Sequence, residues 1–257
     1  MKAVIVHILV VALALLSLCA HAQELGVRTN APTLTQRMAA FESGEMTLDQ
    51  LTESPKWDDE LVAYYQDHKD EVPVKWKLPI SRCLAGLGRY AEAAKVATEY
   101  LDVYSNSARG WRIVGQAQLM ETNYNEAIVA LTNAINLGDT FSYKVLGAAA
   151  LGAGRTNLLR DIVVPHLLKD KDAKGISKDE KLDMALILVC YSLQANQQEI
   201  FVQSLKGLTA SDILERGDLP SYVRTGCERF HDKRIKGICE KLSLQDSVES
   251  KKKGADH

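Results

Sequence analysis

Cysteine and histidine are the side chains of this chain that most often act as nucleophiles, metal ligands or proton carriers. The chain has five cysteines and six histidines, but none stands in a Cys-x-x-Cys or His-Glu-x-x-His spacing. No Gly-x-Ser-x-Gly elbow occurs, so the clearest mark of a serine hydrolase is missing. The adjacent carboxylates of Asp58, Asp59 and Glu60 stand at an expected helix start, where they complement the helix dipole. The sequence therefore predicts no metal site, no cofactor and no catalytic residue.

Cys227 and Cys239 are spaced so that they could face each other. They flank a turn expected at 230–232, between two short helices. Two interpretations stay open: a disulfide across that turn, or two small buried hydrophobic side chains.

The first 22 residues have the composition of a signal peptide. Met1 and Lys2 give a basic start, 3–18 is almost wholly apolar, and Ala20 and Ala22 are the small residues that signal peptidase accepts. The apolar run is shorter than the roughly 20 residues that a membrane span needs. We therefore predict export to the periplasm or the medium, with cleavage near Ala22 and no span afterwards. An uncleaved anchor is the alternative.

The composition of the whole chain is that of a soluble helical protein. Hydrophobic residues make up 46% and charged residues 25%, and only six prolines interrupt 257 residues. The net charge of −2 is too close to zero to indicate nucleic acid or acidic lipid as a partner.

An internal repeat organises the middle of the chain. Segments that begin near Val74, Ala108 and Thr140 align as a first helix, a turn and a second helix. The aligned residues are Ser81, Gly115 and Gly147 within the first helix, and Gly88, Thr122 and Gly154 just after its end.

These segments resemble the tetratricopeptide repeat. The turns read Gly88-Arg-Tyr90-Ala-Glu-Ala93 and Thr122-Asn-Tyr124-Asn-Glu-Ala127, and an aromatic residue, Trp111, precedes the second. The third segment departs from the pattern, with Thr156 and Leu159 where tyrosine and alanine are usual. The resemblance implies an all-α, right-handed solenoid of helical hairpins with flanking capping helices.

The expected organisation has five parts. They are a signal peptide at 1–22, a helical flank at 23–73, repeats at 74–208, capping helices at 209–244 and a charged, disordered tail at 245–257.

The resemblance also implies where a ligand would lie, because the first helix of each tetratricopeptide hairpin lines a concave groove. The alignment places on that face Lys75, Arg82, Arg109, Arg112, Gln116 and Lys144. Five of these six residues are basic, so we expect a groove for an acidic or C-terminal peptide. The asparagines of the family's carboxylate clamp are missing, and a solvated basic face is the other interpretation.

The predicted function is that of an exported adaptor that binds protein or peptide partners. One alternative is a structural subunit of an envelope-assembly or secretion complex, which docks through its convex face or its ends. The other is an enzyme with a pocket in the non-repeat ends, around His68, His166 or His231.

Overall fold

The computed structural model describes residues 33–52, 55–173 and 175–243. In these ranges the regular secondary structure is helical, which confirms the predicted all-α class. The predicted signal peptide and charged tail lie outside the described residues. The chain divides into two units, 1–149 and 150–257, and each is described by itself.

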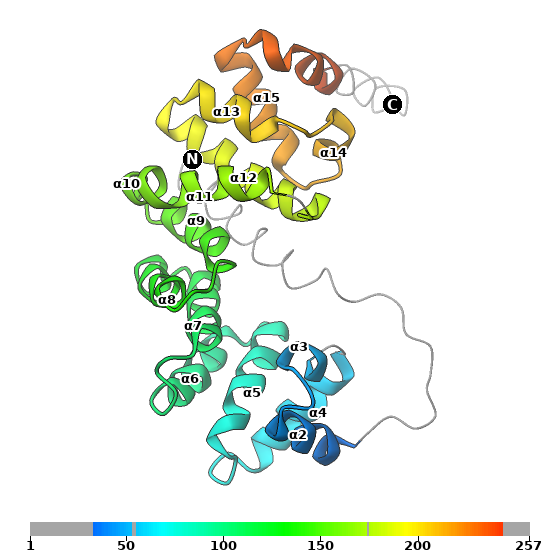
Figure 1. Ribbon diagram of the computed structural model, residues 1–257, viewed down its shortest axis with the longest axis vertical. Helices are drawn as coiled ribbons and strands as arrows, with labels where there is room; N and C mark the ends of the chain where they lie inside the picture. The colour runs from blue at the N-terminus through cyan, green and yellow to red at the C-terminus, as the bar shows by residue number, and fades with distance from the viewer. Residues whose placement is uncertain (1–32, 53–54, 174, 244–257) are drawn as a thin grey trace, which may run out of the picture. The chain divides into compact units, whose positions relative to one another are not determined.

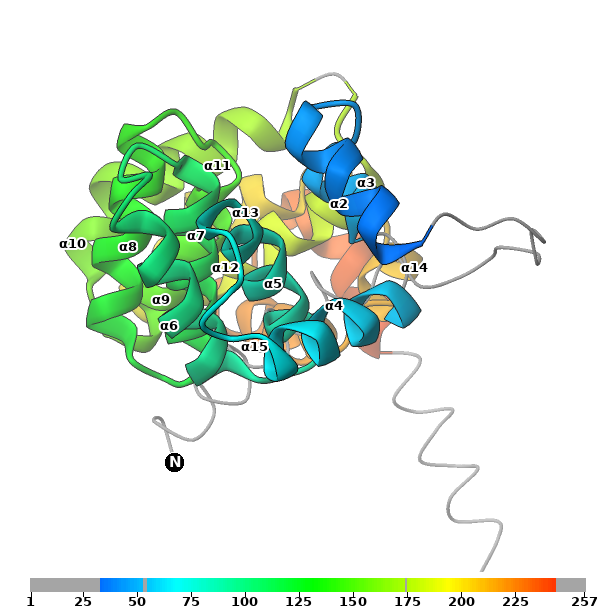
Figure 2. The ribbon, with the colours of Figure 1, turned by 90° about the horizontal axis from the view of Figure 1, so that it is seen from below.

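The first unit consists of helical hairpins preceded by shorter helices (Figure 1). Its helices are α2 (Leu34–Ser43), α3 (Leu48–Leu51), α4 (Pro55–Asp67), α5 (Val74–Gly86), α6 (Tyr90–Leu101), α7 (Ala108–Met120), α8 (Tyr124–Asn136) and α9 (Ser142–Gly152), whose last residues pass into the second unit. Helix α5 packs against α6, α6 against α7 and α7 against α8, as successive hairpins require. Helices α2 and α3 lie side by side (Figure 2).

The aligned turns close these hairpins in the same way. Gly88, Thr122 and Gly154 all have positive φ, at 75°, 62° and 66°. In each turn the next N–H donates to the carbonyl five residues before it, as from Arg89 to Leu84 at 2.9 Å. This is the Schellman ending of a helix, which needs a left-handed residue. The three residues that the sequence alignment places together, Gly88, Thr122 and Gly154, therefore occupy equivalent positions in their turns.

Clusters of buried apolar side chains join the described helices of the first unit. One joins α2 and α4 to the first hairpin and includes Met38, Leu61 and Ile80. Another joins α3 to α7 and includes Leu48 and Ile113. The flank that precedes the repeats is thus part of the packed core.

The second unit is built around one long helix. Its elements are α10 (Thr156–Leu158), the π-helix η1 (Leu159–Val163), α11 (Val164–Lys171), α12 (Lys178–Ala195), α13 (Gln198–Leu205), α14 (Ala210–Leu214), α15 (Leu219–Phe230) and the 3-10 helix η2 (Lys233–Ile235), followed by helical residues 236–243. Helix α12 starts at the predicted capping box, in which Ser177 and Glu180 cap each other's backbone. Residues 182–189 are all buried, as expected of a helix with neighbours on every side.

The second helix of the third repeat is interrupted by the π turn. The N–H of Val164 donates to the carbonyl of Leu159, five residues earlier. Pro165 follows directly, and a proline has no N–H and clashes with the preceding turn of an α-helix. The wider turn accommodates this proline within a continuous helical segment.

Candidate peptide-binding face

The structure joins three of the six predicted groove residues into one cluster. Arg82 projects from α5, and Arg109 and Arg112 project from α7. Burial lowers the pKa of Arg112, as do the positive charges of Arg109 and Arg82, whereas Asp139 and Asp49 act in the opposite direction. A guanidinium still keeps its charge at any ordinary pH. We call these three arginines, with Asp49, Asp139 and Phe141, the basic face.

The other three predicted residues lie on α5, α7 and α9. Lys75 is exposed in the first turn of α5, about two turns before Arg82. Gln116 is half-buried one turn after Arg112, and Lys144 is half-buried on α9.

Asp49 is one of three residues of the basic face that the sequence did not indicate, with Asp139 and Phe141. One carboxylate oxygen of Asp49 lies 2.7 Å from Arg82 Nη1, and the other lies 3.6 Å from Arg109 Nη2. The side chains of Asp49, Arg82 and Arg109 are at least partly exposed, and 61% of the Asp49 side chain is accessible. The sequence does contain a signal for the helix that carries Asp49. It is the capping box that starts α3, in which Thr47 and Gln50 bond to each other's backbone.

Arg112 is held more firmly than Arg82 and Arg109, by residues of the turn between α8 and α9. Its Nη1 donates to Asp139 Oδ1 at 3.0 Å, and the hydroxyl of Ser142 donates to the other oxygen of Asp139 at 2.6 Å. The guanidinium also lies 5.6 Å from the ring centroid of Phe141, a cation–π distance. Phe141 is 66% exposed, so this aromatic ring is available to a partner.

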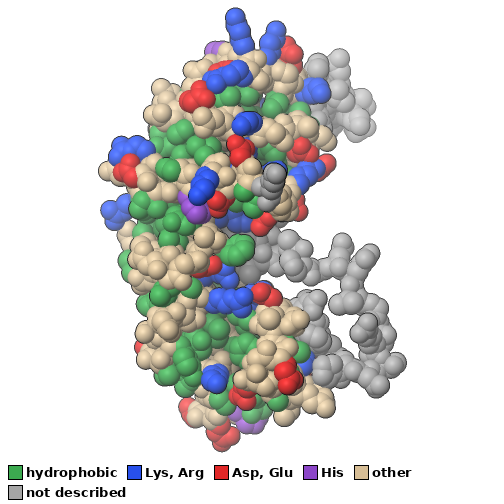
Figure 3. Space-filling view, in the orientation of Figure 1, with side chains coloured by type: hydrophobic (Ala, Val, Ile, Leu, Met, Phe, Trp, Pro, Cys, Tyr) green, Lys and Arg blue, Asp and Glu red, His purple; other side chains and the backbone are tan. Residues whose placement is uncertain are grey.

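The basic face has the electrostatics and chemistry of a binding surface. Three guanidinium groups meet two carboxylates, so the cluster keeps a positive charge. Basic and acidic side chains lie next to each other on the molecular face seen in Figure 3. Arginine forks and an exposed aromatic ring are the groups that contribute most at protein interfaces.

The thiols of the first unit and of α12 do not have the environment of nucleophiles. Cys83 is buried and donates to Asp58 Oδ1 at 3.1 Å. Burial, together with the nearby negative charge of Asp58, raises the pKa of Cys83 well above its ordinary value. Burial likewise raises the pKa of Cys190. A reactive cysteine needs the opposite shift.

The histidines of the enzyme alternative are spread over separate elements. His68 Nδ1 lies 3.0 Å from the carbonyl of Tyr64, and His166 Nε2 lies 2.9 Å from Asp170 on the next turn of α11. His231 ends α15 with a left-handed backbone. Over the described ranges, no group of three potential metal ligands is found.

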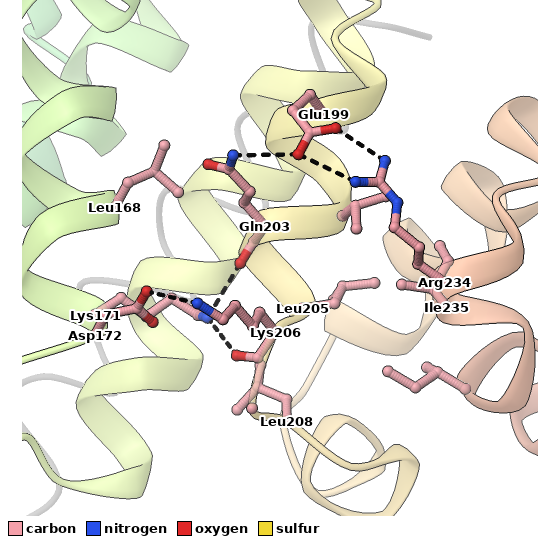
Figure 4. Close-up of a pocket in the computed structure, with 13 residues that line it drawn as sticks. Leu168, Lys171, Asp172, Glu199, Gln203, Leu205, Lys206, Leu208, Arg234 and Ile235 are labelled. Carbon is pink, nitrogen blue, oxygen red and sulfur yellow. Dashed lines mark hydrogen bonds and ion pairs between the residues drawn. The ribbon is translucent and has the colours of Figure 1, made fainter.

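The second unit contains a pocket of about 710 Å³ between α11, α13 and the residues around η2 (Figure 4). Lys171 is almost fully buried there, and its ammonium donates to the carbonyls of Lys206 and Gln203 at 2.6 and 3.2 Å. These carbonyls end α13, so the lysine caps that helix. At the rim Arg234 pairs with Glu199 at 2.9 Å. Because Lys171 is bonded to backbone carbonyls and Arg234 to Glu199, we assign the pocket a structural role.

Cys227 and Cys239 form a disulfide, and their Cα atoms are 5.8 Å apart. The bridge links α15 to the helical residues 236–243, across the turn at which His231 has a positive φ. Of the two interpretations that the sequence left open, the structure therefore has the first, a disulfide across the turn.

Comparison with known proteins places the fold. No family model matches the chain, and no curated protein matches it. Among solved structures, it is similar to one described as "Crystal structure of APC/C hetero-tetramer Cut9-Hcn1", which contains a tetratricopeptide-repeat protein. The match has a TM-score of 0.51 and 13% identity, and it covers 82% of this chain but only 43% of the other.

Three observations therefore agree: the repeat motifs, the Schellman turns in register and the structural match. No helix of the described residues has the length and apolar character to cross a membrane. In fold, the chain is a tetratricopeptide-type array of helical hairpins.

Proposed function

We propose that this protein is an adaptor that binds an acidic segment of another protein through the basic face. The observation that carries the proposal is the cluster of Arg82, Arg109 and Arg112 beside the exposed ring of Phe141. Tetratricopeptide-type hairpins commonly present such surfaces to extended peptides. A segment with carboxylates next to an apolar side chain would match both components of the face.

The proposal is tested with a labelled peptide in an anisotropy titration of the purified protein. The peptide has a Gly-Ser background, three consecutive glutamates and one phenylalanine. Arg109→Glu reverses the charge of an exposed side chain, and we expect it to weaken binding at least tenfold, about 1.4 kcal/mol. Lys95→Glu is the matched control. Lys95 is also exposed, but it lies on α6, the second helix of its hairpin, whereas the three arginines lie on first helices.

The salt dependence distinguishes electrostatic binding at the basic face from nonspecific apolar binding. Raising the ionic strength from about 0.05 to 0.5 M shortens the Debye length to a few ångströms and should weaken binding of the wild-type protein severalfold. The Arg109→Glu variant should show a smaller salt effect. Equal affinities of wild type, Arg109→Glu and Lys95→Glu would exclude the basic face as the binding site.

We also propose that the protein is exported. The composition of 1–22 supports this, and the disulfide between Cys227 and Cys239 suits an oxidising compartment. The intact mass of the protein recovered from its natural source tests the proposal: cleavage after Ala22 removes the first 22 residues.

A structural subunit of a larger complex is the second candidate. It is favoured by exposed apolar residues in the first unit, notably Val103 after α6 and Val129 on α8, each about 60% accessible. Val129→Glu would then prevent co-purification of a stoichiometric partner at high salt, and it would leave binding of the acidic peptide unchanged.

A further inference from the structure

The segment that contributes Asp49 is placed on the basic face as a peptide ligand would be. Helix α3 has only four residues, and Leu48 at its start is 3% exposed. Leu48 belongs to a buried cluster with Leu78 of α5 and with Ile113 and Val114 of α7. The segment is thus anchored by an apolar side chain on the two helices that carry the arginines.

The next residue along the chain supplies the charge. Asp49 directs one carboxylate oxygen to Arg82 and the other to Arg109, so a single carboxylate bridges two helices. An apolar anchor followed by a carboxylate that bridges two arginines is the chemistry proposed above for a partner segment. Here the protein's own chain provides it.

We infer that α3 is an internal competitor for the basic face, and this inference rests on the proposed function. The Asp49 side chain is largely exposed and can rotate away while Leu48 stays buried, so a partner displaces the carboxylate without unfolding the helix. Exposed ion pairs of this kind are weak, so the competition lowers affinity by a modest factor.

The inference also specifies the partner. A segment with one carboxylate exchanges one ion pair for another at Arg82 and Arg109 and gains little. A segment with several adjacent carboxylates replaces Asp49 and in addition places negative charge near Arg112, whose side chain is 19% accessible beside Asp139. The basic face therefore selects clustered acidic residues and discriminates against isolated ones.

The test compares Asp49→Asn with the wild-type protein on two peptides, one with three adjacent glutamates and one with a single glutamate, both with one phenylalanine. Asparagine keeps the shape of the side chain and removes its charge. We expect Asp49→Asn to bind the three-glutamate peptide roughly three- to tenfold more tightly. The single-glutamate peptide should gain by a similar factor, because both peptides displace the same ion pairs of Asp49, and the three-glutamate peptide should remain the tighter ligand of both proteins. Asp102→Asn, an exposed site after α6, is the control and should change neither affinity.

The possible failures are distinguishable. If the wild-type protein binds and Arg109→Glu weakens binding, but Asp49→Asn leaves the affinity unchanged, the competition is overturned and the proposed function stands. Weaker binding by Asp49→Asn would also overturn it, because Asp49 would then hold the arginines in a binding-competent position. If neither protein binds either peptide, the proposed function fails and the inference fails with it. Circular dichroism of each variant verifies that the helices are intact.

Discussion

Gly115 of α7 lies directly against Leu131 of α8, so closely that a Cβ atom at position 115 would fall 2.5 Å from Leu131 Cγ. Both residues are buried in the core of the second hairpin. The repeat pattern marked this position as small, and the structure gives the reason: the two helices of the hairpin touch there.

We predict that Gly115→Ala destabilises the protein by about 1–3 kcal/mol, because overpacking exceeds the small gain from a better helix former. Gly86→Ala is the matched control in the preceding hairpin. The nearest atom to an added Cβ at Gly86 is a carboxylate oxygen of Asp58 at 3.7 Å, an ordinary contact. Urea unfolding followed by circular dichroism should separate the two variants, and equal midpoints would contradict the packing argument.

Thr122 occupies a left-handed backbone position that Gly88 occupies in the preceding hairpin. A β-branched residue at φ 62° is strained by roughly 1–2 kcal/mol, whereas glycine is not. Thr122→Gly should therefore raise the stability by about 0.5–1 kcal/mol after the larger entropy of the unfolded glycine is subtracted. The converse change, Gly88→Ala, should lower the stability by about 1 kcal/mol. Thermal unfolding of both variants measures the pair, and a stabilising Gly88→Ala would contradict the argument.

Asp58 should make the stability of the first unit depend on pH. Burial is the main cause that raises the pKa of Asp58 in the folded protein, against the opposing effect of its hydrogen bond from Cys83. The folded state then binds the proton more tightly than the unfolded chain, so this contribution to stability is present at low pH and is lost as the pH rises through the folded pKa.

Asp58→Asn removes that titration. We expect its unfolding free energy to increase relative to that of the wild-type protein between pH 4 and pH 7. Asp59→Asn is the control, because Asp59 is exposed on the same turn. A difference between Asp58→Asn and wild type that stays constant over this range would contradict the assignment.

The disulfide should stabilise the C-terminal end of the second unit. Closing a short loop between Cys227 and Cys239 restricts the unfolded chain, by about 2–3 kcal/mol in the chain-entropy description. Adding a reductant should lower the unfolding midpoint of the wild-type protein. It should leave the midpoint of Cys227→Ser unchanged, since that variant has already lost the bridge. Thiol labelling of the unfolded protein before and after reduction independently counts the free cysteines and so shows whether the disulfide is present.

The parts of the fold that follow from local chemistry could be predicted from the sequence. The column of Gly88, Thr122 and Gly154 marks turns because a helix that ends in the Schellman manner needs a left-handed residue. The capping box at Ser177 predicts the start of α12 for a similarly local reason. The π turn before Pro165 was not predicted, since the repeat pattern reports the spacing of packed residues and not the bonding within a helix.

The candidate site was only partly predictable. Arg109 and Arg112 lie near each other because they share a helix, and the repeat register adds Arg82 from the preceding one. Asp49 stands far from them in the sequence, and its contact depends on how Leu48 packs. Phe141 gave no signal as part of the site, because its position over Arg112 is set by the turn between α8 and α9.

The π turn at Leu159–Val163 affects how the third repeat can vary in length. An i→i+5 ring holds one residue more than the i→i+4 ring of an α-helix, so the turn stores a residue of chain within a helix. Deleting the exposed Ile162 would convert this ring to an ordinary α-helical one, provided that Pro165, which clashes with an α-helical turn, is also replaced. Insertions and deletions in such arrays are therefore not confined to the connecting loops, and a homologue one residue shorter here could keep Leu159 and Leu167 in the same core positions.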